Sequence, residues 1–240
     1  MSGILPVAVL AGGLGTRVRH RTGASLPKAL LPINGFPFID LKLRELRDGG
    51  ATRVVLLVGH GGHELVAHVG TGDRYGLEIA IVHDPPRLLG TGGAVYHALP
   101  HLGSEFIVTY GDTLLEVSMA RLGELLITSN ADAVMSVLTN DDRWQTSNVD
   151  VEDGWVTAYE KPASAGRHRC LDYGMIAIRA RAFTDVVSDE AFDLGDILRS
   201  LAARRRMRAM FVSRRFYDIG SETSIAETET FLKGVECEAP

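Results

Sequence analysis

The sequence has 240 residues and a formal net charge of −5; its 45% of hydrophobic and 23% of charged residues are typical of a folded globular protein. The acidic balance argues against a protein that holds nucleic acid on a broad basic face, and no apolar run approaches the length that crosses a bilayer. We therefore expect a cytoplasmic protein with neither nucleic acid nor a membrane among its partners.

Strand-like and helix-like segments alternate through the first half of the chain. Strands are expected at residues 7–10, 54–58, 77–82 and 106–110, and helices at residues 38–47, 64–69 and 92–99. This alternation is typical of a parallel sheet whose helical connections cover its faces. In such sheets ligands bind beyond the carboxyl ends of the strands, and this is where Asp112 and the glycines that follow Leu10 lie.

The second half of the chain has a different pattern. We expect helices at 119–129, at 193–203 and from 221 onward, strands at 131–138, 171–178 and 208–212, and an antiparallel hairpin formed by 147–151 and 155–159. The sequence thus predicts an α/β fold: a doubly wound, mainly parallel, Rossmann-like sheet with helices on both faces and a small antiparallel hairpin extension. We expect one domain, residues 1–240, with a nucleotide-binding half of about 1–112 and a second half of about 113–240 that shapes the other substrate.

The first strand ends in a glycine-rich loop. Its glycines are Gly12, Gly13 and Gly15, and the cations that follow it are Arg17, Arg19, Arg21 and Lys28. Bare backbone N–H groups and cations together favour a nucleoside triphosphate. A dinucleotide motif is disfavoured because Val18 stands where its last glycine would be, and the loop also lacks the G-K-S/T of a Walker motif.

Lys28 and a second glycine cluster are further candidates for the site. Lys28 follows Pro27 and precedes an apolar stretch that ends at Pro32, so the backbone that carries it is stiff. The second cluster, Leu89-Gly90-Thr91-Gly92-Gly93, lies between a strand and a helix. Two explanations stay open for it: a close approach of backbone to a base or sugar, or a tight turn with Thr91 as helix cap.

Acidic residues suggest a metal and a second substrate. Asp112 and Asp218, from distant parts of the chain, could hold one Mg²⁺ whose remaining ligands are phosphates and water. Turn chemistry or helix capping is the alternative, and sequence spacing does not show that the two residues meet. Glu160-Lys161 ends a hairpin strand, where it either binds hydroxyls and phosphate or forms a solvated edge.

These motifs together resemble those of the sugar-1-phosphate nucleotidyltransferases, also called nucleoside-diphosphate-sugar pyrophosphorylases. The likeness rests on Leu10-Ala11-Gly12-Gly13-Leu14-Gly15-Thr16-Arg17 with Pro27-Lys28, then Leu89-Gly90-Thr91-Gly92-Gly93, Gly111-Asp112, Glu160-Lys161-Pro162 and Tyr217-Asp218-Ile219-Gly220. Within this family, the segment around Tyr217-Asp218-Ile219-Gly220 is most similar to the branch of heptose-1-phosphate and mannose-1-phosphate guanylyltransferases. Where many relatives carry Asn-x-Gly, this chain has Asp172-Tyr173-Gly174, which leaves the sugar open.

The resemblance implies a role for each of these residues. The nucleotide would be held by Leu10, Ala11, Gly12, Gly13, Gly15, Thr16, Gly92, Gly93 and Asp112. Arg17 and Lys28 would stabilise the reacting phosphates as catalytic residues. The cofactor Mg²⁺ would be held by Asp112 and Asp218. The sugar phosphate would be contacted by Glu160, Lys161, Asp172 and Gly174.

We therefore expect an enzyme that transfers a nucleoside monophosphate from a nucleoside triphosphate, with GTP favoured, to a heptose or hexose 1-phosphate. The products would be a nucleoside-diphosphate sugar and pyrophosphate, and the enzyme would be a monomer or a homodimer. The alternatives are a non-catalytic protein that binds sugar nucleotides, an NAD-binding oxidoreductase, and a uridylyl-, thymidylyl- or cytidylyltransferase of the same fold.

Overall fold

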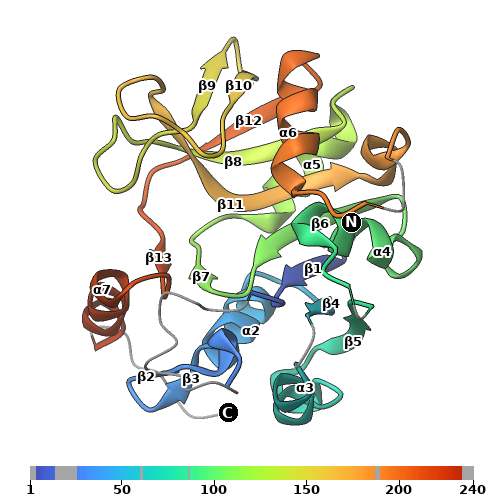
Figure 1. Cartoon of the computed structure of the whole chain (residues 1–240), viewed down its shortest axis with the longest axis vertical. Coiled ribbons are helices and arrows are strands. Elements are labelled where there is room, and N and C mark those ends of the chain that lie inside the picture. Colours follow the sequence, from blue (N-terminus) through green and yellow to red (C-terminus); the bar gives the residue numbers. More distant parts are fainter. Residues whose placement is uncertain (1–3, 14–25, 60–61, 86, 187–189, 234–240) are drawn as a thin grey trace.

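The computed structural model describes residues 4–13, 26–59, 62–85, 87–186 and 190–233. Its main feature is a nine-stranded sheet. The strands are β1 (Val7–Leu10), β4 (Arg53–Val58), β5 (Glu78–His83), β6 (Glu105–Tyr110), β8 (Ala133–Thr139), β9 (Val149–Glu152), β10 (Trp155–Tyr159), β11 (Cys170–Arg179) and β12 (Met207–Val212). They lie in the order β5-β4-β1-β6-β11-β8-β12-β10-β9 (Figure 1).

The sheet is mixed, which corrects the prediction of a mainly parallel one. The first four strands, β5, β4, β1 and β6, are mutually parallel, as the strand-helix alternation predicts. Strand β11, however, runs antiparallel to both β6 and β8, and β10 runs antiparallel to β12 and β9. The apolar pattern of a strand reveals its burial but not the direction of its neighbour, so the sequence predicted the antiparallel pairing of β9 with β10, as a hairpin, but not the antiparallel pairings of β11 with β6 and β8 or of β10 with β12.

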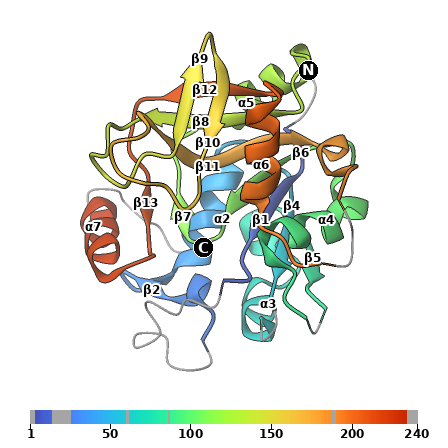
Figure 2. The same cartoon turned by 45° about the horizontal axis from the view of Figure 1, so that its top comes forward.

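The far end of the sheet curls into a small barrel-like unit. In addition to its place beside β6 and β8, β11 pairs with β9 through Cys170 and Val149. The Asn148 N–H donates a hydrogen bond to the Cys170 carbonyl at 2.8 Å, so the circuit β11-β8-β12-β10-β9 closes on itself. The predicted hairpin is present as β9 and β10, at the top of both views (Figures 1 and 2).

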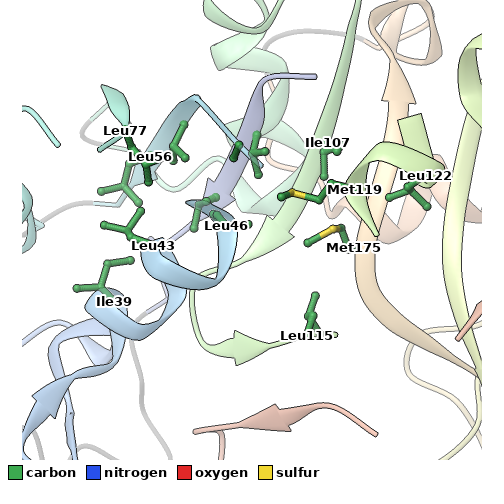
Figure 3. Packing of buried hydrophobic residues seen from close by; sticks show 14 of the residues in the cluster. Ile39, Leu43, Leu46, Leu56, Leu77, Ile107, Leu115, Met119, Leu122 and Met175 are labelled. Carbon is green, nitrogen blue, oxygen red and sulfur yellow. The ribbon is translucent and has the colours of Figure 1, made fainter. Parts of the chain in front are cut away.

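Helices cover both faces of the sheet, as predicted. They are α2 (Phe38–Asp48), α3 (His63–Val69), α4 (Gly90–Leu102), α5 (Met119–Thr128), α6 (Leu194–Ala203) and α7 (Glu222–Lys233), with 3₁₀ turns at Lys28–Leu30, Asp73–Tyr75 and Ala180–Phe183. Alternate residues of β1 point to opposite faces: Val7 and Val9 join the core under α2, α3 and α5, and Ala8 joins the core under α4 and α6. Figure 3 shows the first of these cores, in which residues such as Leu43 and Met119 meet the sheet.

Two short pairs of strands extend the fold beyond the main sheet. Strand β7 (Thr113–Leu114) pairs with β13 (Tyr217–Asp218), and β2 (Pro32–Ile33) pairs with β3 (Phe36–Pro37). A third apolar cluster, with Ile219 and Ile225 among its members, packs α7 beside β13, away from β5 and α3 in both views (Figures 1 and 2). The β7–β13 pair matters most here because Asp112 directly precedes β7.

In the described part of the chain, no helix has the length and apolar character needed to span a membrane.

Candidate active site

Lys28, Asp112 and Asp218 lie together at the carboxyl end of the parallel strands. The Lys28 Nζ donates a hydrogen bond to the Asp112 Oδ2 at 2.6 Å, and the Lys28 side chain is only 13% exposed. Asp218 is brought next to this pair because it is opposite Thr113 in the β7–β13 ladder, and the Ile219 N–H bonds to the Asp112 carbonyl at 3.1 Å. The structure thus brings together three residues that the sequence singled out separately.

The carboxylate of Asp218 is held in a fixed orientation. Its Oδ1 accepts the Gly220 N–H at 2.7 Å, and its Oδ2 accepts the Gln145 side-chain amide at 3.2 Å. Its backbone carbonyl accepts the Thr228 hydroxyl of α7 at 2.8 Å. These contacts aim the carboxylate into the same cavity that Asp112 lines.

The donor set fits a divalent cation that takes most of its ligands from substrate. Asp112 and Asp218 offer two carboxylates, which are hard oxygen ligands of the kind that Mg²⁺ prefers. Among the described residues no group of three or more His, Cys, Asp or Glu side chains could hold a metal ion. A site of this kind would therefore be completed by phosphate oxygens and water.

Two cavities meet at Lys28 and Asp112. The larger has a volume of about 790 Å³ and the smaller one of about 260 Å³. Both are lined by Gly13, Lys28, Tyr110 and Asp112. An elongated ligand in one cavity and a second ligand in the other would therefore come together at this lysine and this aspartate.

The smaller cavity contains most of the predicted nucleotide residues that the structure describes. Leu10, Ala11, Gly12 and Gly13 line it. A Cβ at Gly12 would lie 2.8 Å from the backbone nitrogen of Gly59, so glycine is required where the loop after β1 passes the end of β4. The predicted Gly15, Thr16 and Arg17 lie outside the described residues.

The second glycine cluster is explained mainly by packing. Gly92 and Gly93 lie in the first turn of α4, where both N–H groups donate to the Phe192 carbonyl, at 3.0 and 3.3 Å. A Cβ at Gly92 would meet the Phe192 ring at 2.4 Å. Neither glycine is among the residues that line these two cavities; from this cluster, Gly90 and Thr91 line the smaller one. The Thr91 hydroxyl accepts the Leu194 N–H of α6 at 2.9 Å, whereas the N-terminus of α4 has no side-chain cap.

The predicted sugar-phosphate residues all line the larger cavity: Glu160, Lys161, Asp172 and Gly174. The Lys161 Nζ lies 3.7 Å from the Asp193 Oδ1. Gly174 has a φ of +96°, which a residue with a side chain rarely adopts, and its N–H donates to the Asp172 Oδ1 at 3.0 Å. Burial raises the pKa of Asp172, and the Gly174 N–H and the Lys161 charge lower it in part.

The wall between the two cavities carries a hydroxyl that stays protonated. Burial raises the pKa of Tyr110, and the nearby carboxylates of Asp172, Asp193 and Asp112 raise it further. A neutral phenol can donate a hydrogen bond to a phosphate or a sugar oxygen without adding negative charge.

Sequence reasoning missed three residues at these cavities or beside them. Asp84 directly follows β5 and lines the smaller cavity; the rule that drew attention to Asp112 after β6 could have found it. Gln145, in a loop with no motif, and His168, which holds Glu160 from outside the larger cavity, gave no sequence signal.

Comparison with known proteins identifies the family. The MobA-like NTP transferase domain matches residues 7–209. The D-glycero-α-D-manno-heptose 1-phosphate guanylyltransferase of Campylobacter jejuni is 28% identical over 214 residues, which cover 88% of this chain and 93% of the relative. The N-acetylmuramate α-1-phosphate uridylyltransferase of Neisseria meningitidis is 36% identical over 110 residues, 45% of this chain and 47% of that protein.

Solved structures agree with this family at the level of the fold. HddC from Yersinia pseudotuberculosis, complexed with GMP-PN, has a TM-score of 0.77 at 24% identity, with 95% of this chain and 99% of that chain covered. The inositol-1-phosphate CTP transferase of T. maritima has a TM-score of 0.79 at 20% identity, with coverages of 99% and 100%. The chain belongs to the MobA-like NTP transferase family, so the resemblance to nucleotidyltransferases predicted from its motifs is confirmed.

Proposed function

We propose that this nucleotidyltransferase transfers a nucleoside monophosphate, from GTP by preference, to a heptose or hexose 1-phosphate. The single observation that supports this most is the meeting of two cavities at Lys28 and Asp112. The nucleotide would occupy the smaller cavity, with its phosphates at the junction. The sugar 1-phosphate would enter from the larger one.

The reaction would be an in-line displacement. A phosphate oxygen of the sugar 1-phosphate attacks the α-phosphorus of the triphosphate, the new P–O bond forms, and the bond to the β-phosphate oxygen breaks to release pyrophosphate. The protein contributes position and charge rather than a covalent intermediate. Lys28, oriented by Asp112, would reduce the repulsion between the two phosphate groups.

The backbone after β1 would contact the triphosphate. Leu10, Ala11, Gly12 and Gly13 line the smaller cavity, and we retain Gly15, Thr16 and Arg17 as further phosphate ligands. Gly92 and Gly93 would act through the shape that their packing on Phe192 gives to the start of α4. In the larger cavity, Glu160, Lys161, Asp172 and Gly174 would bind the sugar phosphate.

We propose that Asp112 and Asp218 hold Mg²⁺, as enzymes of this family generally use a divalent metal ion. When bound, the ion would supply positive charge to the phosphates. Cytoplasmic location and a monomeric or homodimeric state stay predictions.

Asp84 favours guanine as the base. It lines the smaller cavity, burial raises its pKa while His97 lowers it, and its carboxylate has no hydrogen bond to any residue that the structure describes. Guanine presents two adjacent donors, N1–H and the 2-amino group, which match the two oxygens of a carboxylate. The Campylobacter relative is a guanylyltransferase, which supports the same choice.

Competing nucleotides test this base preference. We expect kcat/KM for GTP to exceed that for ITP, which lacks the 2-amino group, by about tenfold, and the Asp84→Asn variant to lose most of this difference. A panel of hexose and heptose 1-phosphates is run with GTP, UTP, dTTP and CTP, and product masses are recorded. A product formed best from a pyrimidine triphosphate, or an unchanged ratio of GTP to ITP in Asp84→Asn, would contradict guanine recognition by this residue.

A further inference from the structure

The imidazole of His168 bridges two carboxylates beside the larger cavity. Its Nδ1 lies 2.8 Å from the Asp150 Oδ2, and its Nε2 lies 2.9 Å from the Glu160 Oε2. The side chain is only 7% exposed. Ionised carboxylates only accept hydrogen bonds, so both contacts are favourable at once only when the ring carries a proton on each nitrogen. The geometry is therefore that of an imidazolium between two acids.

The fold brings the three residues of this bridge together. Asp150 lies on β9, Glu160 directly follows β10, and His168 lies two residues before the start of β11. These three strands are joined where the barrel-like unit closes, through the Cys170–Val149 pair and the bond from the Glu160 N–H to the Asn148 carbonyl at 2.9 Å. The backbone of Glu160 is thus fixed, and its side-chain orientation depends on its partners.

Glu160 interacts more weakly with its second partner, Arg167. The Arg167 Nη1 donates to the Glu160 Oε1 at 3.0 Å, but the Arg167 side chain is 63% exposed. An exposed ion pair contributes little because water screens it and both long side chains lose freedom. His168 is the better buried of the two partners, so it decides where the carboxylate of Glu160 points.

We propose that His168 is a positioning residue which, as the imidazolium, holds Glu160 ready for the hydroxyl groups of the sugar 1-phosphate, so that sugar binding weakens when the ring loses its second proton. This proposal rests on the proposed function, which gives Glu160 its contact with the sugar. His168 itself touches no substrate.

The direction of the pH effect follows from the charges around the ring. Burial lowers the pKa of His168, but the hydrogen bonds and charges of Glu160 and Asp150 outweigh it and raise the pKa above its ordinary value. The pKa of Asp142, from the loop after β8, is lowered mainly by the N–H groups of Ser147 and Gly166 and to a smaller extent by the charge of His168. Arg167 is the cation on the other side of Glu160. A raised pKa means that the bridge is complete below that pKa, where the two carboxylates are still ionised, and is lost as the pH rises through it.

Steady-state kinetics as a function of pH tests the proposal. For the wild type, we expect KM for the sugar 1-phosphate to rise about tenfold across the His168 transition, with little change in kcat or in KM for the nucleotide. His168→Gln should show the higher KM at every pH and no transition. Asp150→Asn removes one of the two acids that raise the pKa, so its transition should move to lower pH.

Control experiments distinguish a failure of the His168 proposal from a failure of the proposed function. His101→Gln, at the exposed end of α4, should keep the wild-type profile, and thermal unfolding checks that each variant is folded. If His168→Gln kept both the wild-type KM and its pH dependence, the proposal would be wrong, as it would if the transition in Asp150→Asn did not move. If instead the wild type used no sugar 1-phosphate at all, the proposed function would fail and not merely the role of His168.

Discussion

Lys28 is the residue on which the proposed chemistry of this site depends most. Its side chain is only 13% exposed, it lies at the junction of both cavities, and among the described residues its ammonium group pairs with Asp112. Substrate phosphates would bring several negative charges to a place that holds two acidic side chains. A buried cation there acts in a region of low dielectric, where its effect on phosphate charge is stronger than in water.

Replacing Lys28 tests this role. Lys28→Ala should lower kcat on the order of a hundred-fold or more, since a well-placed electrostatic group has been removed. The melting temperature should change little, because Asp112 is 39% exposed and water can solvate it. Pyrophosphate release is the measurement, and Lys233→Ala, at the exposed end of α7, is the control. A Lys28→Ala enzyme with near wild-type turnover would remove this lysine from the mechanism.

The residues of the candidate site were predictable from sequence to different degrees. Lys28 and Asp112 were found because a proline-flanked lysine and an aspartate after a buried strand are local patterns. The approach of Asp218 to Asp112 was not predictable, because it depends on the β7–β13 pair, whose strands are two residues long. His168 was missed because its two carboxylate partners come from separate strands.

At the scale of elements, α4 shows how one glycine motif can both pack closely and line a cavity. Its first turn packs on the segment around Phe192 so closely that side chains are excluded at Gly92. Gly90 and Thr91, from the same motif, face the smaller cavity. From sequence, the motif left a choice between ligand contact and a tight turn. The structure shows close packing on Phe192 at both Gly90 and Gly92, and the contact of Gly90 and Thr91 with a ligand stays a prediction.

Two glycine substitutions separate an effect on packing from an effect on nucleotide binding. Gly92→Ala should destabilise the protein by about 1–3 kcal/mol, because its Cβ would overlap the Phe192 ring, which lies 2.4 Å from the position of that atom. In Gly13→Ala, the Cβ would meet nothing within 4 Å, so the free energy of unfolding should change by less than about 0.5 kcal/mol. Because Gly13 lines both cavities, KM for the nucleotide should rise instead.

Denaturant unfolding and nucleotide kinetics on both variants provide the comparison. Equal stability losses in Gly92→Ala and Gly13→Ala would contradict a packing role for Gly92 alone. An unchanged nucleotide KM in Gly13→Ala would contradict the contact of Gly13 with the nucleotide.

At the scale of the whole molecule, the mixed sheet joins two kinds of construction. The parallel strands β5, β4, β1 and β6 end in loops that line the smaller cavity, and the barrel-like unit from β11 to β9 provides most of the wall of the larger one. The alternating pattern of strands and helices was enough to predict the first part. For the second part, the sequence predicted the separate strands and helices and the β9–β10 hairpin but not the closure, because closure of the unit depends on a single long-range pair between β11 and β9. The division into two halves near Asp112 stays a prediction.

The central claim is that the two cavities bring a triphosphate and a sugar 1-phosphate together for direct transfer. The most direct measurement is the stoichiometry of products from GTP, Mg²⁺ and the sugar 1-phosphate that the enzyme uses best, with pyrophosphate and sugar nucleotide quantified in the same sample. We expect one pyrophosphate for each nucleoside-diphosphate sugar, and neither product when the sugar 1-phosphate is left out. Pyrophosphate released without sugar nucleotide, or binding of both substrates with no turnover, would contradict the account.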